Sequence, residues 1–391
     1  MLEEEFKDST GVVYCSSFPA MDAAVGEVMR YLQSKTVGAA SMLRICEALR
    51  NRLVKASPNR SLNDEDEAAL ARLAMRAKEC RDDTQAVDVE YVFDRKFLFR
   101  VLVLGNAQLA QLAGLRGPNT QTNAACSGTT QGIAMAHDML VSGRALRVVV
   151  IAGDNASGET LLPWLGAGFR ALGAACTKST VEEAAKPFAA DRSGLILSGG
   201  GIGIVVETEA SAEERGVKGR ARLLATQYSN SAFHGAALDV KHITSELERF
   251  MGEIMLLHGV SKEEVAEHGV YLSHETSTHS SPTSACSFAE ITALRAVFGE
   301  SLGSLLVCNT KGFLGHPMGV SFEDVAAVEI LHKQIVPPVV GAGGSGFKKD
   351  SHLGELKLST GGPYAARYAL RFSAGFGSQV AFALYGMVES E

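Results

Sequence analysis

The chain has 391 residues, of which 46% are hydrophobic and 21% are charged, and its formal net charge is −7. A chain of this length can build a large core or two similar halves, and the composition is that of an ordinary globular enzyme. The acidic balance, without a basic run interleaved with aromatic residues, argues against a protein that binds nucleic acid or another polyanion.

The first part of the chain has the pattern of one strand followed by helices. Gly11–Cys15 is a short apolar run that predicts a strand, and Met21–Leu32 predicts a helix. Residues 36–90 are expected to be largely helical, because Leu62–Lys78 begins with acidic residues and carries apolar residues at helical spacing. Its charges are most simply explained as a solvated helix face. A further helix is expected over Phe97–Leu115, where a glycine and a Gly-Pro turn end it.

A strand–cysteine–helix unit follows. Asn119–Ala125 predicts a short strand that leads directly into Cys126, and residues 128–141 predict a helix with an apolar face. Arg147–Ala152 then predicts a buried strand. The pattern is like the nucleophile elbow of serine hydrolases, in which a tight turn exposes the nucleophile at the start of a helix.

Leu195–Glu207 is rich in glycine and predicts a strand or a hairpin. A dinucleotide-binding loop is the alternative, but Val206 stands where the last glycine of the G-x-G-x-x-G spacing is required. Structural glycines are therefore the better interpretation.

Strands and helices alternate through the rest of the chain. The predicted strands are Arg220–Gln227, Gly269–Ser273, Leu305–Cys308, Tyr368–Phe372 and Gln379–Tyr385, and the predicted helices are Ser245–His258, Glu290–Phe298 and Glu323–His332. This alternation indicates an open α/β sheet, whose ligands bind beyond the carboxyl ends of the strands.

Cys126 is the candidate nucleophile. A helix N-terminus favours the thiolate, so its position predicts a thiol pKa below the ordinary value of about 8.5. The small residues Ser127, Gly128 and Thr129 leave room for backbone N–H groups to reach a thioester oxygen. The alternative is a buried structural cysteine.

His274 and His316 each lie in a separate loop of small residues that follows a predicted strand. Two imidazoles beside a thiol suit thioester chemistry, because the thiol carries an acyl group while the imidazoles polarise a second thioester. Neither histidine lies in an HExxH motif or at a metal-binding spacing from a cysteine, so we expect no metal.

The chain has seven cysteines, and no two of them have the short spacing of a zinc motif. An odd number argues against a disulfide framework and predicts a reducing compartment, the cytoplasm. The acidic N-terminus has no apolar stretch of a signal peptide, and the sequence has no apolar run of 18 residues.

These residues make the chain similar to the β-ketoacyl synthase family of the thiolase fold, in particular its elongating type. The matching segments are Ala113–Pro118, Asn123–Gly128 with Cys126, Lys186–Gly194, His274–Thr278, Thr310-Lys311 with Gly315-His316, Glu323 ahead of Val336–Pro338, and Gly375–Gly377. They occur in the family's order over about residues 113–340 and 368–386. The C-terminal segment from Gly361 to Ser378 resembles condensing domains embedded in multidomain synthases.

The resemblance implies a fold of two similar α/β/α halves in a five-layered α-β-α-β-α core. Residues 1–208 would form the half that carries Cys126, and residues 209–391 the half that carries both histidines. The family opens with a strand and a helix before the strand that Gly11–Cys15 resembles. That opening is missing here, so the first half is expected to be short of strands.

The resemblance also implies a mechanism. Cys126 accepts an acyl group, and His274 and His316 assist the decarboxylation of a malonyl-type extender whose carbanion attacks the acyl group. The remaining implied site residues are Lys311 and Glu323 as a supporting ion pair, Phe376 and Gly377 as the oxyanion hole and gate, and Thr276 and Thr278 as contacts to the phosphopantetheine arm.

The implied partners are an acyl carrier protein with its phosphopantetheine thioesters, and acyl and malonyl thioesters as substrates. The chain is expected to form a homodimer or part of a larger synthase in fatty acid or polyketide biosynthesis. No cofactor is implied, and we expect no nucleic acid and no membrane span.

Four positions depart from the family pattern. Glu275 stands where the family has glycine, and its carboxylate either favours the charged form of His274 or points away from it. Residues 279–284 replace the family's proline and glycine–aspartate in a longer loop. Gly199 replaces an acidic residue, and Ser378 replaces the last glycine of the gating turn.

Two alternatives remain open from the sequence. A thiolase shares the fold and a Gly-His-Pro turn, which Gly315–Pro317 matches, but thiolases need a second cysteine near the C-terminus, and the last cysteine here is Cys308. A non-catalytic partner subunit of the chain-length-factor type normally lacks the nucleophile, whereas this chain retains Cys126.

Overall fold

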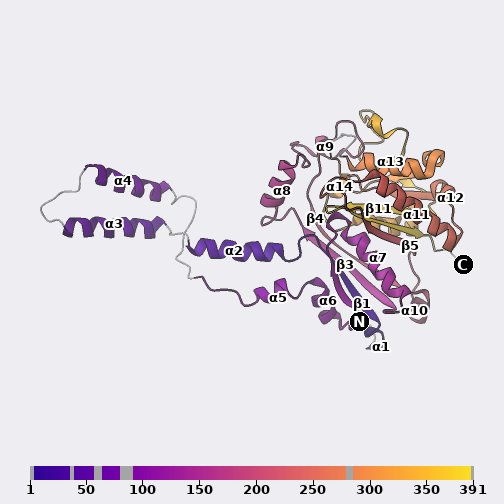
Figure 1. The fold of residues 1–391 in the computed structure, drawn as a ribbon, viewed down its shortest axis with the longest axis horizontal. Helices are drawn as coiled ribbons and strands as arrows, with labels where there is room; N and C mark the ends of the chain where they lie inside the picture. Colours follow the sequence, from indigo (N-terminus) through magenta and orange to yellow (C-terminus); the bar gives the residue numbers. More distant parts are fainter. Residues whose placement is uncertain (1–3, 36–38, 57–63, 80–90, 279–284, 389–391) are drawn as a thin grey trace. The chain divides into compact units, whose positions relative to one another are not determined.

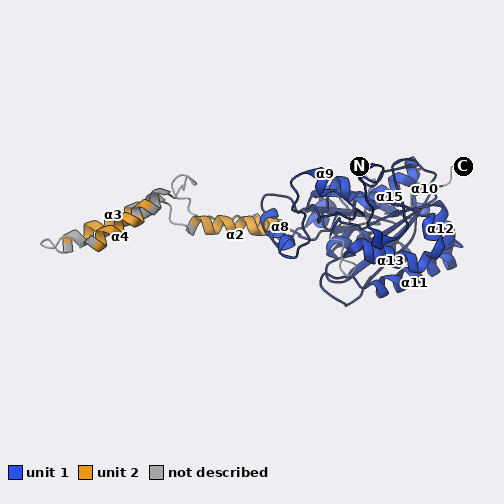
Figure 2. Ribbon diagram, turned by 90° about the horizontal axis from the view of Figure 1, so that it is seen from above, with its two compact units in different colours: residues 1–19, 103–391 blue, residues 20–102 orange. Residues whose placement is uncertain are grey.

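The computed structural model describes residues 4–35, 39–56, 64–79, 91–278 and 285–388 (Figure 1). The chain divides into two compact units, one made of residues 1–19 with 103–391 and the other of residues 20–102 (Figure 2). The strands lie in the larger unit, as far as the structure describes the chain.

The smaller unit is helical. Its helices are α2 (Met21–Lys35), α3 (Ala39–Ala56), α4 (Asp64–Glu79) and α5 (Phe97–Val101). Within it, α2 packs with α5 and α3 packs with α4, and the hydroxyl of Tyr91 donates a hydrogen bond of 2.7 Å to Glu27 of α2. The helices predicted at Met21–Leu32 and within residues 36–90 are confirmed in the described part. Residues 36–38, 57–63 and 80–90 lie outside it.

The prediction of one long helix over Phe97–Leu115 is wrong. The structure has α5 and then a separate helix, α6 (Gly105–Ala113), which belongs to the larger unit. Leu104 between them is extended, with ψ 179°. Gly105 lies against the ring of Tyr14 in the first sheet, where an added Cβ would come within 3.1 Å of the ring. Tertiary packing of α6 on the sheet therefore sets its start, which helical periodicity alone does not show.

The first sheet has four strands among the described residues, in the order β2-β1-β3-β4. They are β1 (Thr10–Cys15), β2 (Asn119–Thr122), β3 (Arg147–Asn155) and β4 (Gly199–Glu207). β1 runs parallel to both β2 and β3, and β4 is antiparallel to β3. The glycine-rich segment thus forms a single strand, and the hairpin interpretation is wrong.

The second sheet has the order β5-β12-β11-β6-β7-β9. Its strands are β5 (Arg222–Asn230), β6 (Gly269–Leu272), β7 (Leu306–Cys308), β9 (Lys357–Leu358), β11 (Tyr368–Gly375) and β12 (Gln379–Gly386), and β8 (Ile335–Val336) pairs with β10 (Gly362–Pro363) beside it. The larger unit also contains α7 (Gly128–Val141), α11 (Val240–His258), α12 (Lys262–His268), α13 (Cys286–Phe298) and α15 (Phe322–Lys333). Its short helices are α1 (Glu4–Lys7), α8 (Leu162–Ala171), α9 (Val181–Ala184), α10 (Glu209–Glu214) and α14 (Lys311–Leu314).

Helices α7 and α15 contact both sheets and so form a layer between them. Side chains alternate across a strand, and in β1 Val13 and Cys15 face α7 while Tyr14 faces α6 on the other side. An added Cβ at Gly132 of α7 would collide with the Cys15 sulfur, so this glycine allows the helix to pack closely on the sheet. α11 and α13 form the buried cluster on the outer face of the second sheet. The layers are therefore α-β-α-β-α, the thiolase-like α/β fold.

In the sequence, the strands of the first sheet come before residue 208 and the strands of the second sheet come after it. The compact units, however, divide the chain at other positions. A division into halves at residues 208 and 209 stays a prediction. None of the helices in the described ranges combines the length and the apolar character needed to cross a membrane.

Candidate functional site

The nucleophile turn connects β2 to α7. Residues Ala125–Ser127 form one turn of 3-10 helix, and Ala125 has a positive φ of 47°, which is unfavourable for a residue with a Cβ. Gly375 at the end of β11 packs against this turn: a Cβ there would collide with the carbonyl oxygen of Ala124 and lie 3.1 Å from the backbone nitrogens of Cys126 and Ser127. A strained turn held by a neighbouring strand is the arrangement expected of a nucleophile elbow.

The thiol and the two imidazoles come together. The Sγ atom of Cys126 lies 3.1 Å from Nε2 of His316. The rings of His316 and His274 meet edge to face, with centroids 5.9 Å apart. All three side chains are buried. The sequence predicts these residues in one site, and in the structure His316 contacts both Cys126 and His274.

The Cys126 thiol does not have the depressed pKa predicted from the helix N-terminus. Burial raises its pKa to about 12, and the opposing effects of Lys311 and of the backbone N–H groups of Cys126 and Phe376 are smaller. Desolvation therefore outweighs the helix end. The resting side chain is a protonated thiol, and its attack requires a base.

Both histidines are neutral at neutral pH. Burial, together with Lys311 and Arg371, lowers the pKa of His316 to about 3 and holds that of His274 well below its ordinary value. A neutral imidazole has one nitrogen that accepts a proton and one that donates. The Nε2 atom of His316 faces the Cys126 thiol and is suited to accept its proton.

Lys311 and Glu323 form the ion pair implied by the resemblance, with Nζ and Oε1 2.7 Å apart. The carboxylate also accepts hydrogen bonds from the hydroxyls of Thr310 and Ser321, at 2.8 and 3.1 Å. Arg371 of β11 lies 3.3 Å from its second oxygen. Burial alone would raise the pKa of Glu323, but the two cations outweigh it and hold the pKa well below its ordinary value. Glu323 is thus an anion between two buried cations.

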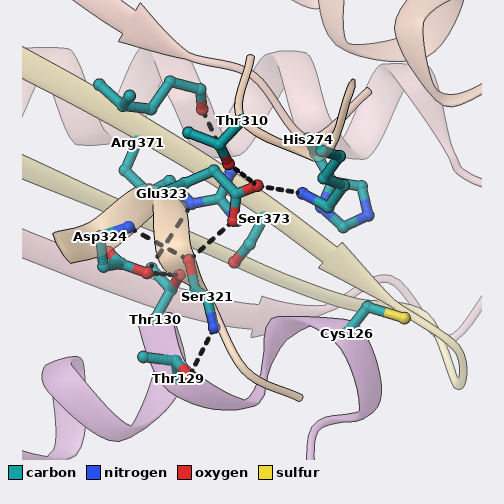
Figure 3. Close-up of polar contacts among 12 residues, drawn as sticks. Cys126, Thr129, Thr130, His274, Thr310, Ser321, Glu323, Asp324, Arg371 and Ser373 are labelled. Carbon is teal, nitrogen blue, oxygen red and sulfur yellow. Dashed lines mark hydrogen bonds and ion pairs between the residues drawn. The ribbon is translucent and has the colours of Figure 1, made fainter. Parts of the chain in front are cut away.

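Hydrogen bonds from α7 cross to the segment that follows His316. The backbone N–H and hydroxyl of Thr129 both donate to the carbonyl of Gly319, at 3.1 and 2.7 Å. The hydroxyl of Thr130 donates to Asp324 of α15 at 2.7 Å (Figure 3). Cys126 lies just before α7, and His316 lies just before the segment that these bonds hold. The bonds therefore fix the distance between the two residues.

The predicted gating turn lies beside Cys126, because the backbone N–H of Phe376 reaches its thiol. Phe376 follows β11, is 37% exposed, and its ring lies 5.8 Å from that of Phe169. Gly377 has a φ of 81°, and Ser378 also has a positive φ of 64°. The Ser378 hydroxyl donates to the carbonyl of His234 at 2.8 Å, so this departure from the family pattern ties the turn to the loop after β5.

Thr276 and Thr278 lie in the loop after β6. The hydroxyl of Thr276 is 3.4 Å from that of Thr278 and 3.4 Å from the sulfur of Cys286. Their predicted contact with a phosphopantetheine arm stays a prediction. The longer loop at residues 279–284 lies outside the described residues.

Two site residues were missed by sequence reasoning. Asp154, at the end of β3, accepts hydrogen bonds from Ser16, Ser17 and Gly319, and the Gly319 bond, 2.8 Å long, joins it to the His316 loop. Glu290 of α13 accepts the backbone N–H of His274 at 2.9 Å. Asp154 lies just beyond a predicted strand, a position that could have indicated a site residue. No residue next to Glu290 in the sequence indicates that it belongs to the site.

Within the ranges that the structure describes, no group of three or more His, Cys, Asp or Glu side chains could hold a metal ion. The geometry is therefore that of a thiol, two neutral imidazoles and a buried ion pair.

Comparison with known proteins is consistent with this chemistry. Residues 101–212 match the family model "Beta-ketoacyl synthase, N-terminal domain". The chain is 29% identical over 243 residues to 3-oxoacyl-[acyl-carrier-protein] synthase 2 of Vibrio cholerae, which covers 61% of this chain and 55% of that protein. The chain thus spans little more than half the length of this curated relative.

Solved structures agree on the fold. The chain matches the ketosynthase complex titled "AntDE:AntF (apo): type II PKS acyl-carrier protein in complex with its ketosynthase bound to the hexaketide", with a TM-score of 0.67 and 18% identity, over 99% of this chain and 79% of that one. It also matches "The ishigamide ketosynthase/chain length factor", with a TM-score of 0.70 and 17% identity, over 100% and 78% of the two chains. At these identities the similarity is evidence for the fold alone.

Proposed function

We propose that this chain, a member of the β-ketoacyl synthase family, acts as a 3-oxoacyl-[acyl-carrier-protein] synthase in fatty acid or polyketide biosynthesis. One observation carries the proposal: the Cys126 sulfur lies 3.1 Å from Nε2 of the neutral His316, whose ring packs against that of His274. A protonated thiol beside a neutral base is suited to acyl transfer.

In the first step, Cys126 attacks the carbonyl carbon of an acyl thioester. Nε2 of His316 takes the thiol proton, because it lies within hydrogen-bond distance of the sulfur. The backbone N–H groups of Cys126 and Phe376, which both favour negative charge at this position, would stabilise the tetrahedral oxyanion. The carrier thiolate leaves and receives the proton, so the acyl group is now on Cys126.

In the second step, a malonyl thioester loses carbon dioxide beside the acyl-enzyme. N–H groups of His274 and His316 would donate hydrogen bonds to the enolate oxygen that forms. The enolate carbon attacks the acyl carbonyl, the bond to Cys126 breaks, and the sulfur is reprotonated with a proton from solvent. The products are a 3-ketoacyl thioester, carbon dioxide and the free thiol.

Lys311 and Glu323 would tune this site without touching the reacting atoms. Burial has the largest effect in lowering the pKa of both histidines, and Lys311 has the next largest. Both effects keep the imidazoles neutral for proton transfer. Glu323 in turn fixes Lys311 at 2.7 Å. A neutral imidazole keeps one ring nitrogen free to accept a proton.

Thr276 and Thr278 would contact the phosphopantetheine arm of an acyl carrier protein, the partner we propose. A structural match is titled as a ketosynthase in complex with such a carrier, and the relative from Vibrio cholerae is named for it. We also propose that the chain works as a homodimer or within a larger synthase, in the cytoplasm.

Intact-protein mass spectrometry tests the function. The purified chain is incubated with an acyl thioester of coenzyme A or acyl carrier protein, and one acyl adduct is expected. The adduct should disappear in Cys126→Ala, because Cys126 is the one cysteine in the described residues whose sulfur contacts an imidazole. An adduct of equal yield in Cys126→Ala would refute the site assignment.

The second candidate is a non-catalytic partner subunit, favoured by the match to a ketosynthase/chain length factor structure. The same experiment separates the two functions. A folded chain that forms no adduct at all would support the partner subunit.

A further inference from the structure

The carboxylate of Glu275 points away from the imidazole of the neighbouring His274. Its Oε1 atom accepts the backbone N–H of Ser277 at 3.0 Å and that of Phe188 at 3.5 Å. Its Oε2 atom accepts the thiol of Cys286 at 3.3 Å. The pKa of Cys286 is raised, by burial first and then by Glu275 and Glu290, so the thiol keeps its proton and remains a donor.

Arg192 completes this buried cluster. Its side chain is 0% exposed, and its Nε atom lies 3.5 Å from Oε1 of Glu275 and donates to the carbonyl of Thr278 at 2.8 Å. The Nη1 atom donates to the carbonyl of Ala189 at 2.8 Å, and Nη2 lies 2.9 Å from Oδ2 of Asp350. One guanidinium thus joins three segments that are far apart in the sequence.

The cluster determines the shape of the loop after His274. Ser277 has a positive φ of 60°, which is unfavourable for serine, and its carbonyl accepts the N–H of Gly194 at 2.7 Å. The amide of Asn309 donates to the Glu275 carbonyl at 2.8 Å. Ser277 lies between Thr276 and Thr278. The hydrogen bonds of Ser277 to Glu275 and Gly194 therefore also fix the backbone of both threonines.

The cluster contains one guanidinium and two carboxylates. Asp350 has a pKa below its ordinary value, because His352 and Arg192 outweigh the effect of its burial. Arg192 therefore faces two carboxylates, and Nδ1 of the half-exposed His352 contacts Asp350 at 2.9 Å. Removal of the Glu275 charge leaves Arg192 with Asp350 alone and should loosen its hydrogen bond to the Thr278 carbonyl.

We propose that Glu275 and Arg192 are positioning residues that hold Thr276 and Thr278 for the phosphopantetheine arm of the extender thioester. This rests on the proposed function of the same site. Neither residue touches the sulfur of Cys126 or the reacting carbons. Their loss should weaken recognition of the arm and leave intact the acylation of Cys126 by a thioester that lacks the arm.

The test compares Glu275→Gln and Arg192→Lys with the unmodified chain in condensation assays. With malonyl-acyl carrier protein we expect KM to rise about tenfold, the usual effect of losing one charged hydrogen bond. With malonyl-N-acetylcysteamine, which lacks most of the arm, KM should change less than about twofold. Acylation of Cys126 by an acyl-N-acetylcysteamine thioester, followed by intact mass, should keep its rate. Glu209→Gln, which breaks an exposed ion pair with Arg222, is the matched control.

An equal rise in KM for both extenders, or no rise for either, would overturn the proposal. If Glu275→Gln does not fold, Glu275→Gly serves, because it removes the carboxylate that accepts the Ser277 N–H while Arg192 keeps its ion pair with Asp350, and the same rise in KM is expected. Loss of the native circular dichroism spectrum in all three variants would make the cluster a folding element and also refute the proposal. Absence of condensation by the unmodified chain would instead refute the proposed function.

Discussion

The Cys126 sulfur and Nε2 of His316 are 190 residues apart in sequence and 3.1 Å apart in space. The thiol is protonated because burial raises its pKa to about 12, and the imidazole is neutral because burial lowers its pKa to about 3. Neither group carries charge until substrate arrives. Under the proposed function, the reactivity of this cysteine would therefore depend on proton transfer to His316 and not on a preformed thiolate.

This protonation state predicts how Cys126 reacts with iodoacetamide. Below the pKa of a thiol, the thiolate fraction rises about tenfold per pH unit. The alkylation rate at Cys126 should therefore increase steadily from pH 6 to pH 9, as measured by peptide mass spectrometry at this residue. A plateau near neutral pH would show a depressed thiol pKa and contradict the structure.

Glu323 predicts a pH-dependent stability. Its pKa is lowered in the folded state, because Lys311 and Arg371 outweigh burial, so the unfolded chain binds more protons below its ordinary pKa of 4.5. Its stabilising contribution is complete above that pH and is lost as the pH falls toward the folded pKa. Glu323→Gln should lower the free energy of unfolding at pH 7 by about 3 kcal/mol, since it leaves two buried cations short of a partner.

Urea unfolding at pH 7 and pH 4 measures this effect. The free energy of unfolding of the unmodified chain should decrease from pH 7 to pH 4. That of Glu323→Gln should decrease less over the same range. Glu329→Gln, which weakens exposed ion pairs on the same helix, is the control and should cost under about 1 kcal/mol. An equal pH dependence in Glu323→Gln and the unmodified chain would show that this carboxylate does not carry the effect.

At the scale of elements, the end of β11 and the nucleophile turn fit together only because residue 375 is glycine. A Cβ there would collide with the carbonyl oxygen of Ala124 and crowd the N–H nitrogen of Cys126. Gly375→Ala should therefore reduce the rate of Cys126 acylation by about 100-fold, since displacement of a reacting group by about 1 Å has this effect. The rate is measured by intact mass over time.

Gly203→Ala is the matched control, because Gly203 lies in β4 with no heavy atom within 4 Å of its added Cβ. Its acylation rate should stay within about twofold of the unmodified chain. If Gly375→Ala also kept its rate, the close packing of this strand on the turn would not matter for the chemistry.

Much of the element order was predictable from sequence, because periodicity and glycine signals are local. The strands before Cys126 and His274 and the helix after Cys126 are examples. The break at Leu104 was not predictable, because α6 begins where Gly105 meets Tyr14 of a strand about 90 residues earlier. The site residues followed from motifs. Their pKa values did not, because the burial that raises the pKa of Cys126 depends on the complete fold.

At the scale of the whole molecule, hydrogen bonds near Cys126 join the two sheets of the larger unit. Ser127 of the nucleophile turn and Ser373 of β11 are 2.8 Å apart, and Thr130 of α7 bonds Asp324 of α15. These buried bonds link the two sheets. The two halves of this unit should therefore unfold together.

Thiol labelling across a urea series tests this cooperativity. Cys15 is the last residue of β1 in the first sheet, and Cys308 is the last residue of β7 in the second sheet. Both side chains are buried. Both should become reactive with the same urea midpoint, as in a two-state transition. Exposure of Cys15 at a clearly lower urea concentration than Cys308 would show that the first sheet opens independently.

The buried, protonated state of Cys126 also bears on oxidative damage. Peroxide attacks the thiolate and not the thiol, and the sulfinic and sulfonic products are not reversed by ordinary thiols. A cysteine that is 8% exposed and whose thiol has a pKa of about 12 offers almost no thiolate at rest. The unloaded protein should therefore survive a peroxide burst that inactivates enzymes with a permanent thiolate.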